Sequence, residues 1–120
     1  MSGTVLSPDN AAEEAEVAAW FAARSETPVI ETACARVYLA GGTAFKVKRR
    51  VDLGYLDFTT LDQRRWALER ELAFNQATAA DIYRGVRRVT RSADGRLELE
   101  GFGVTVDYAL EMRRFDETLV

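Results

Sequence analysis

The sequence predicts an α+β fold with a largely antiparallel sheet. Three observations support this fold class: two segments with apolar residues at helical spacing, a pair of alternating runs around a Gly-Gly turn, and further strand-like runs around an Asp-Gly turn. The expected order is a helix, two or three strands, a second helix and about three more strands. At 120 residues, 48% of them hydrophobic, the chain fits one compact domain.

The first helix is expected over Ala11–Arg24, after the candidate N-cap Asp9. Acidic residues fill its first turns, as the helix dipole favours. The segment Ser25–Pro28 ends it. Its apolar face is formed by residues at helical spacing, Val17, Trp20 and Phe21.

Two antiparallel strands, Arg36–Ala40 and Thr43–Lys48, are expected on either side of Gly41-Gly42, whose positive φ angles would form a two-residue turn. Because side chains alternate along a strand, Lys46 and Lys48 share one face. Ala44 lies on that face, while Phe45 and Val47 lie on the other. We expect the lysines to point away from the apolar packing side.

A second helix is expected from the capping box formed by Thr60 and Gln63 to about Ala79. Trp66 and Phe74 widen its apolar surface, which predicts a helix covered on more than one side. Its main apolar stripe consists of Leu61, Leu68, Leu72 and Ala79.

Three further strands are expected, over 82–90, 96–106 and 108–112. Asp94-Gly95 predicts a hairpin turn between the first two. The G-x-G of Gly101-Phe102-Gly103 is interpreted as an irregularity within a strand.

Composition excludes several classes of site. The chain has no histidine and a single cysteine, Cys34, which excludes Ser-His-Asp and Cys-His catalysis, His-ligated metals and an intrachain disulfide. Neither a P-loop nor a G-x-G-x-x-G turn is present. No membrane-spanning or leader segment is recognised, so we expect a cytoplasmic protein without a membrane partner.

The charge distribution leaves one non-enzymatic alternative open. The net charge is −3, but residues 43–91 hold eleven basic and six acidic residues. Lys46–Arg50 and Arg84–Arg91 could therefore form a basic surface for nucleic acid or an acidic partner. Aromatic residues that could stack on nucleobases are not interleaved with these basic residues, so nucleic acid is the less favoured partner.

A strand lysine in the pattern Ala44-x-Lys46, followed by a capped helix that carries Glu69 and Glu71, is typical of a protein kinase. There a strand lysine holds the α and β phosphates of ATP and is held by a helix glutamate. The alternative is that all these charges are solvated surface residues. Helical periodicity does not choose between Glu69 and Glu71.

From Pro28 onward, the sequence resembles the kinase-like aminoglycoside phosphotransferase family. The resemblance implies a protein-kinase-like N-terminal lobe over 28–120. This lobe would contain an antiparallel sheet of about five strands and one helix equivalent to the kinase αC. The expected N-terminal helix and a linker, over 1–27, would precede it. The blocks that carry it are Val29–Thr32, Val37–Gly41, Ala44–Lys48, Tyr55–Leu61, Arg64-Arg65, Glu71–Asn75, Ile82-Tyr83, Gly85-Val86 and Met112–Phe115.

The resemblance also implies the site residues. Lys46 would anchor the phosphates of ATP, Glu71 would hold Lys46, and the backbone of Glu111 and Met112 would begin the hinge that meets the adenine ring. The loop Thr32–Cys34 would lie over the nucleotide. Full-length relatives would transfer a phosphoryl group to the hydroxyl of a small molecule, and some carry a second, P-loop domain.

The family's catalytic His-x-Asp loop and metal-binding Asp belong to a C-terminal lobe, which we expect to be missing from these 120 residues. Asp57-Phe58-Thr59 precedes the second helix and lacks glycine, so it is interpreted as a turn. We therefore expect no catalytic or metal-binding residue and no kinase activity in this chain, with Mg²⁺ needed only beside a C-terminal lobe. The uncovered cleft face would expose apolar surface and favour self-association.

Overall fold

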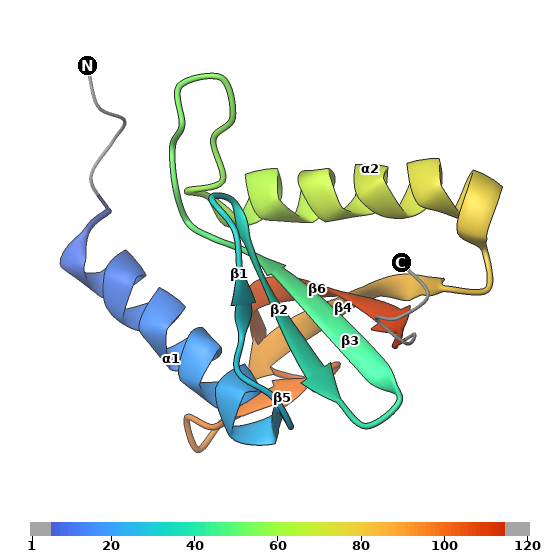
Figure 1. Cartoon of the computed structure of the whole chain (residues 1–120). Helices are drawn as coiled ribbons and strands as arrows, with labels where there is room; N and C mark the ends of the chain where they lie inside the picture. The colour runs from blue at the N-terminus through green and yellow to red at the C-terminus, as the bar shows by residue number, and fades with distance from the viewer. Residues whose placement is uncertain (1–5, 115–120) are drawn as a thin grey trace.

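The computed structural model describes residues 6–114 and confirms the α+β fold (Figure 1). Phe115, the last residue of the resembling blocks, lies outside the described residues. Within 6–114 the chain forms two helices and one antiparallel six-stranded sheet. In chain order the elements are α1 (Pro8–Arg24), β1 (Ile30–Glu31), β2 (Ala35–Ala40), β3 (Thr43–Lys48), α2 (Leu61–Ala79), β4 (Tyr83–Arg91), β5 (Leu97–Leu99) and β6 (Val104–Arg113).

The strand order is β1-β2-β3-β6-β4-β5. β6 lies in the middle of the sheet, between β3 and β4, although it is the last strand of the described chain. The sheet has one strand more than the expected five or so, because the short segment Ile30–Glu31 pairs with Val37 and Arg36 at the edge.

The expected hairpin is confirmed, since Ala40 and Thr43 pair across Gly41-Gly42. Only one of the two glycines has a positive φ, which is 60° at Gly41. The Asp94-Gly95 turn is also confirmed, with a φ of 89° at Gly95.

The caps set where the helices begin. The capping box of Thr60 and Gln63 opens α2 as expected. The expected N-cap of α1, Asp9, is wrong by two residues: Ser7 is the N-cap and accepts a 3.1 Å hydrogen bond from the Asn10 N–H. Pro8 then takes the first helical position, where its missing N–H costs nothing.

The two helices cover opposite faces of the sheet (Figure 1). On one face, Val17 and Phe21 of α1 pack with Tyr38 and Val47. On the other, Leu68 of α2 packs in a second cluster with Leu39, Ala44, Leu110 and Met112. The face that carries Lys46 and Lys48 is therefore also a packing face, which corrects the expectation that the lysines point away from apolar contacts.

Helix α2 is not covered on more than one side, contrary to expectation. Leu68 is fully buried, whereas Trp66 is 62% exposed and Phe74 is 80% exposed. The sheet covers only the side of the helix that carries Arg64 and Leu68.

The strand expected over 96–106 is interrupted. β5 ends at Leu99, the chain turns through Glu100 with a φ of 54°, and β6 begins at Val104. A Cβ at Gly103 would lie 1.7 Å from the carbonyl oxygen of Arg91, so the close approach of these backbones requires glycine. Gly101-Phe102-Gly103 thus belongs to a turn between two strands.

Asp107 of β6 is 1% exposed and binds two buried arginines. Its Oδ1 accepts a 2.9 Å hydrogen bond from Nε of Arg64, at the start of α2. Its Oδ2 lies 3.2 Å from Nη2 of Arg50, which follows β3. Arg50 in turn lies 2.7 Å from Oε1 of Glu13 on α1. One carboxylate therefore connects the central strand to both helices.

Replacing Asp107 with Asn should lower the free energy of unfolding by about 3–5 kcal/mol, because two guanidinium groups would stay buried without their shared counter-charge. Urea denaturation would measure the loss. Asp81→Asn is the matched control, since Asp81 forms an exposed pair with Arg113 and its loss should cost less than about 1 kcal/mol. Equal losses in the two variants would contradict the assignment of Asp107.

Candidate functional site

Lys46 and Glu71 form a close ion pair between the sheet and α2. Nζ of Lys46, on β3, lies 2.6 Å from Oε2 of Glu71, and both side chains are partly buried. Glu71 lies one turn beyond Leu68, whose packing against Ala44 and its neighbours fixes the height of α2 over the sheet. Backbone register and core packing together therefore bring the carboxylate to the lysine.

Glu69 takes no part in this pair. Its Oε1 lies 3.1 Å from Nε of Arg65, one turn earlier on α2, and both side chains are about half exposed. The structure thus pairs Lys46 with Glu71 and leaves Glu69 on the helix surface.

Lys48 contacts the same carboxylate through its other oxygen. Nζ of Lys48 lies 3.5 Å from Oε1 of Glu71 and 5.2 Å from the ring centroid of Phe58. Lys46 and Lys48 are the only lysines among the 16 basic residues of the chain. The alternation along the strand predicts that both lie on one face, but it does not predict that they share Glu71. The sequence feature that could have indicated a shared partner is the i, i+2 spacing of these two lysines in a chain whose other basic residues are all arginines.

The structure places Glu111 and Met112 inside β6 rather than in a free hinge segment. Met112 pairs with Ala44 on one side and Tyr83 on the other, so its strand neighbours occupy both edges of the backbone. Glu111 pairs with Phe45, and its carboxylate binds Arg87 at 2.9 Å. Met112 faces α2, as Lys46 does, whereas Glu111 faces the opposite side of the sheet. Both residues thus lie near the end of β6, which continues to Arg113, and their backbone contact with adenine stays a prediction.

The loop Thr32–Cys34 is tied to the end of β3. Nη1 of Arg49 donates to the carbonyl oxygens of Thr32 and Ala33, at 3.0 and 3.2 Å. The Arg49 N–H donates to the carbonyl of Cys34 at 2.8 Å. Since Ala35 pairs with Lys48, this loop lies beside the Lys48 end of β3.

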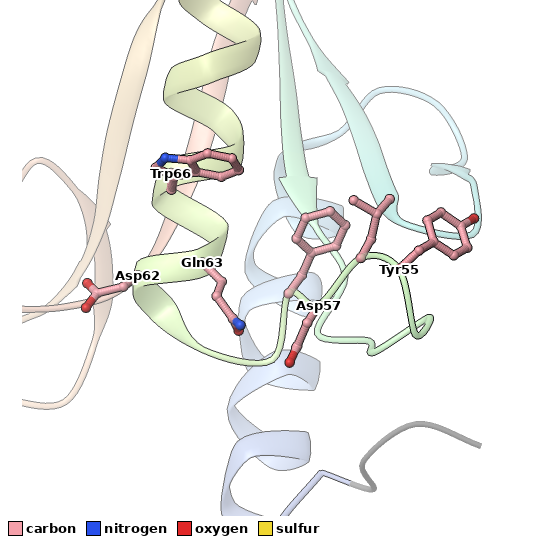
Figure 2. A pocket seen from close by; sticks show the side chains of 7 residues that line it. Tyr55, Asp57, Asp62, Gln63 and Trp66 are labelled. Carbon is pink, nitrogen blue, oxygen red and sulfur yellow. The ribbon is translucent and has the colours of Figure 1, made fainter. Parts of the chain in front are cut away.

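A pocket of about 470 Å³ lies between the loop that precedes α2 and the first two turns of that helix (Figure 2). Neither Lys46 nor Glu71 lines it, but Phe58, whose ring faces Lys48, does. Hydrogen bonds from the Thr59 hydroxyl and N–H lower the pKa of Asp57, which keeps this carboxylate ionised as a turn cap. The lining residues are Tyr55, Leu56, Asp57, Phe58, Asp62, Gln63 and Trp66.

The arginines of β4 pair with acidic residues of neighbouring elements. Glu111 contacts both Arg84 and Arg87, Glu100 contacts Arg88, and Glu16 of α1 contacts Arg91. The hydrogen bond from Arg91 lowers the pKa of Glu16, as expected for a carboxylate stabilised in its charged form. The basic run in the sequence is therefore largely neutralised in the fold.

Two kinds of feature are absent from residues 6–114. No group of three or more His, Cys, Asp or Glu side chains could hold a metal ion there. No helix in this part of the chain is both long and apolar enough to cross a membrane.

The chain is similar to uncharacterized mycobacterial proteins. One is from Mycobacterium bovis and two are from strains of Mycobacterium tuberculosis, each 40% identical over 70 residues. The match covers 58% of this chain and only 14% of each relative, so the shared segment is about one seventh of their length. No family model matches the sequence, and no solved structure matches it.

Replacing Glu71 with Gln should lower the free energy of unfolding by about 1–2 kcal/mol, because two partly buried ammonium groups lose their carboxylate. This loss lies between the values typical of surface ion pairs and of fully buried ion pairs. Thermal or urea denaturation would measure the change. Glu69→Gln removes the same charge from the exposed side of α2 and should cost less than about 0.5 kcal/mol. A larger loss in Glu69→Gln than in Glu71→Gln would be incompatible with this site.

Proposed function

We propose that this chain is the ATP-binding lobe of a kinase-like phosphotransferase that resembles the aminoglycoside phosphotransferases. The observation that supports the proposal is the 2.6 Å ion pair between Lys46 on the third strand and Glu71 on the helix that follows it. Protein kinases place their phosphate-binding lysine and its glutamate on the same two elements in the same order.

The chemistry of the pair fits this role. A lysine ammonium is a compact charge on a flexible stem, and a glutamate contact restricts where it can lie. Held in this way, Lys46 would meet the α and β phosphates of a nucleotide without a large search over side-chain conformations. Its side chain is 26% exposed, so it keeps access to a ligand from solvent.

The two residues proposed to begin the hinge lie on opposite faces of the sheet. Met112 lies on the same face of the sheet as Lys46 and could contribute its side chain to an apolar wall beside the purine. Glu111 lies on the other face and binds two arginines there. The backbone of these two residues, near the end of β6, would begin the hinge that meets the adenine ring.

Phosphoryl transfer to a small-molecule hydroxyl is the activity we propose for a whole protein that contains this lobe. Transfer needs positioned Mg²⁺ and a residue that orients the acceptor. The 120 residues contain no histidine and hence no His-x-Asp loop. We therefore propose nucleotide binding without turnover for this chain by itself.

The alternative, a basic surface for nucleic acid or an acidic protein, has less support. The arginines of β4 already have carboxylate partners, and Arg50 is buried beneath α1. A surface neutralised in this way offers few free cations to a phosphate backbone.

The purified chain should bind ATP, and Lys46→Ala should weaken binding at least tenfold, because the variant loses the ammonium that faces the phosphates. Isothermal titration calorimetry would measure both affinities. Arg96→Ala is the matched control for loss of one positive charge, since Arg96 is 86% exposed in the β4–β5 turn, and it should bind as the unchanged protein does.

The same experiment separates the two functions. Tight binding of an oligonucleotide that falls steeply with salt, together with no ATP binding, would favour the basic-surface function. Hydrolysis of ATP by the 120 residues that disappears in Lys46→Ala would contradict binding without turnover.

A further inference from the structure

The site contains one more positive charge than a simple lysine–glutamate pair. Lys46, Lys48 and Glu71 are each at most 26% exposed and meet around one carboxylate, so the cluster carries a net charge of +1. A pair consisting only of Lys46 and Glu71 would be neutral. The extra charge lies in a partly desolvated environment, where charges interact more strongly than in bulk water.

The two lysines differ in how firmly they are held. Lys46 is the more exposed, at 26%, and lies 2.6 Å from Oε2. Lys48 is 11% exposed, lies 3.5 Å from Oε1, and is also positioned over the ring of Phe58. A ring face attracts an ammonium group, which favours the observed placement of Lys48. Since each lysine contacts a different oxygen, both can stay on the carboxylate at the same time.

We propose that Lys48 is a positioning residue for binding nucleotides with two or more phosphates. It keeps Glu71 neutralised and in place while Lys46, still held by Glu71, binds the phosphates. This inference rests on the proposed ATP-binding function and adds to it a second lysine, a role for its charge, and a preference for the phosphate chain over the nucleoside.

The physical reason is the charge that an incoming phosphate meets. Without Lys48, the negative charge of Glu71 would cancel the positive charge of Lys46, and the cluster would present no net charge to the phosphates. With Lys48, the carboxylate remains paired throughout, so the net attraction for a polyanion is retained. Adenosine carries no charge and should be insensitive to this difference.

A merely structural role for Lys48 makes a different prediction. If Lys48 only packed beneath α2, its replacement would lower stability and weaken ATP and adenosine binding by similar factors. The ratio of the two affinities therefore distinguishes a role in charge from a role in packing.

The test compares ATP and adenosine binding in Lys48→Met and Lys48→Arg, with Arg96→Ala as the control for charge. We expect Lys48→Met to bind ATP about five- to tenfold more weakly, from the loss of one partly screened charge, with adenosine affinity unchanged. Lys48→Arg should recover most of the ATP affinity. Unchanged ATP affinity in Lys48→Met, or a parallel loss for ATP and adenosine, would overturn the inference.

A second measurement follows the lysines directly. Reductive methylation with ¹³C-formaldehyde keeps the lysine charge and labels the two lysines and the N-terminal amine. Lys46→Arg and Lys48→Arg assign the lysine signals. On addition of ATP, the Lys46 signal should move most, and the Lys48 signal should move little. Equal movement of the two signals would contradict the retention of Lys48 on Glu71.

The failure of this inference is distinct from that of the proposed function. If the unchanged protein bound no ATP and neither lysine signal responded, both would fall. If ATP binding depended on Lys46 but the Lys48→Met variant kept full affinity, the proposed function would stand and only the role of Lys48 would be wrong.

Discussion

The shared carboxylate of Asp107 is the constraint on which the arrangement of the helices depends. Arg50 and Arg64 are each 2% exposed, and without this carboxylate their guanidinium groups would be buried without their shared counter-charge. Because Arg64 lies in the first turn of α2, the contact fixes where that helix begins over the sheet. Arg50 extends the connection to α1 through Glu13. Charges that are costly to bury thus set the position of the elements that carry the candidate site.

The candidate site follows from this placement. With the start of α2 held by Arg64 and the next turn held by Leu68, Glu71 falls above β3, where the pleat presents both lysines. Glu69 differs from Glu71 by two residues, which turns it to the opposite flank of the helix, toward Arg65. A rotation of α2 about its axis would carry Glu71 away from both lysines, so the ion pair depends on the buried network as well as on its own attraction.

Local patterns in the sequence predicted the local features well. Turn chemistry at Gly41 and Gly95, the Thr60 capping box and the alternation along β3 each depend on residues close together in the chain. What could not be predicted depends on distant partners. Asp107 interrupts an apolar run and gives no sign that two arginines neutralise it, and Gly103 reveals its close approach to Arg91 only in three dimensions. Glu111 and Met112 were assigned to the hinge by resemblance, whereas their position in the sheet depends on strands far apart in sequence.

The central position of β6 has a consequence for the order in which the sheet can assemble during synthesis. The β2–β3 hairpin and the β4–β5 hairpin lie on opposite sides of β6, which pairs with both. Until that strand has left the ribosome, each hairpin has an unpaired inner edge, and neither face of the sheet can close. Long-range pairing of this kind slows folding and leaves strand edges open to non-native pairing. A chaperone that covers these strand edges until residue 113 has left the ribosome would therefore protect the nascent chain from non-native pairing.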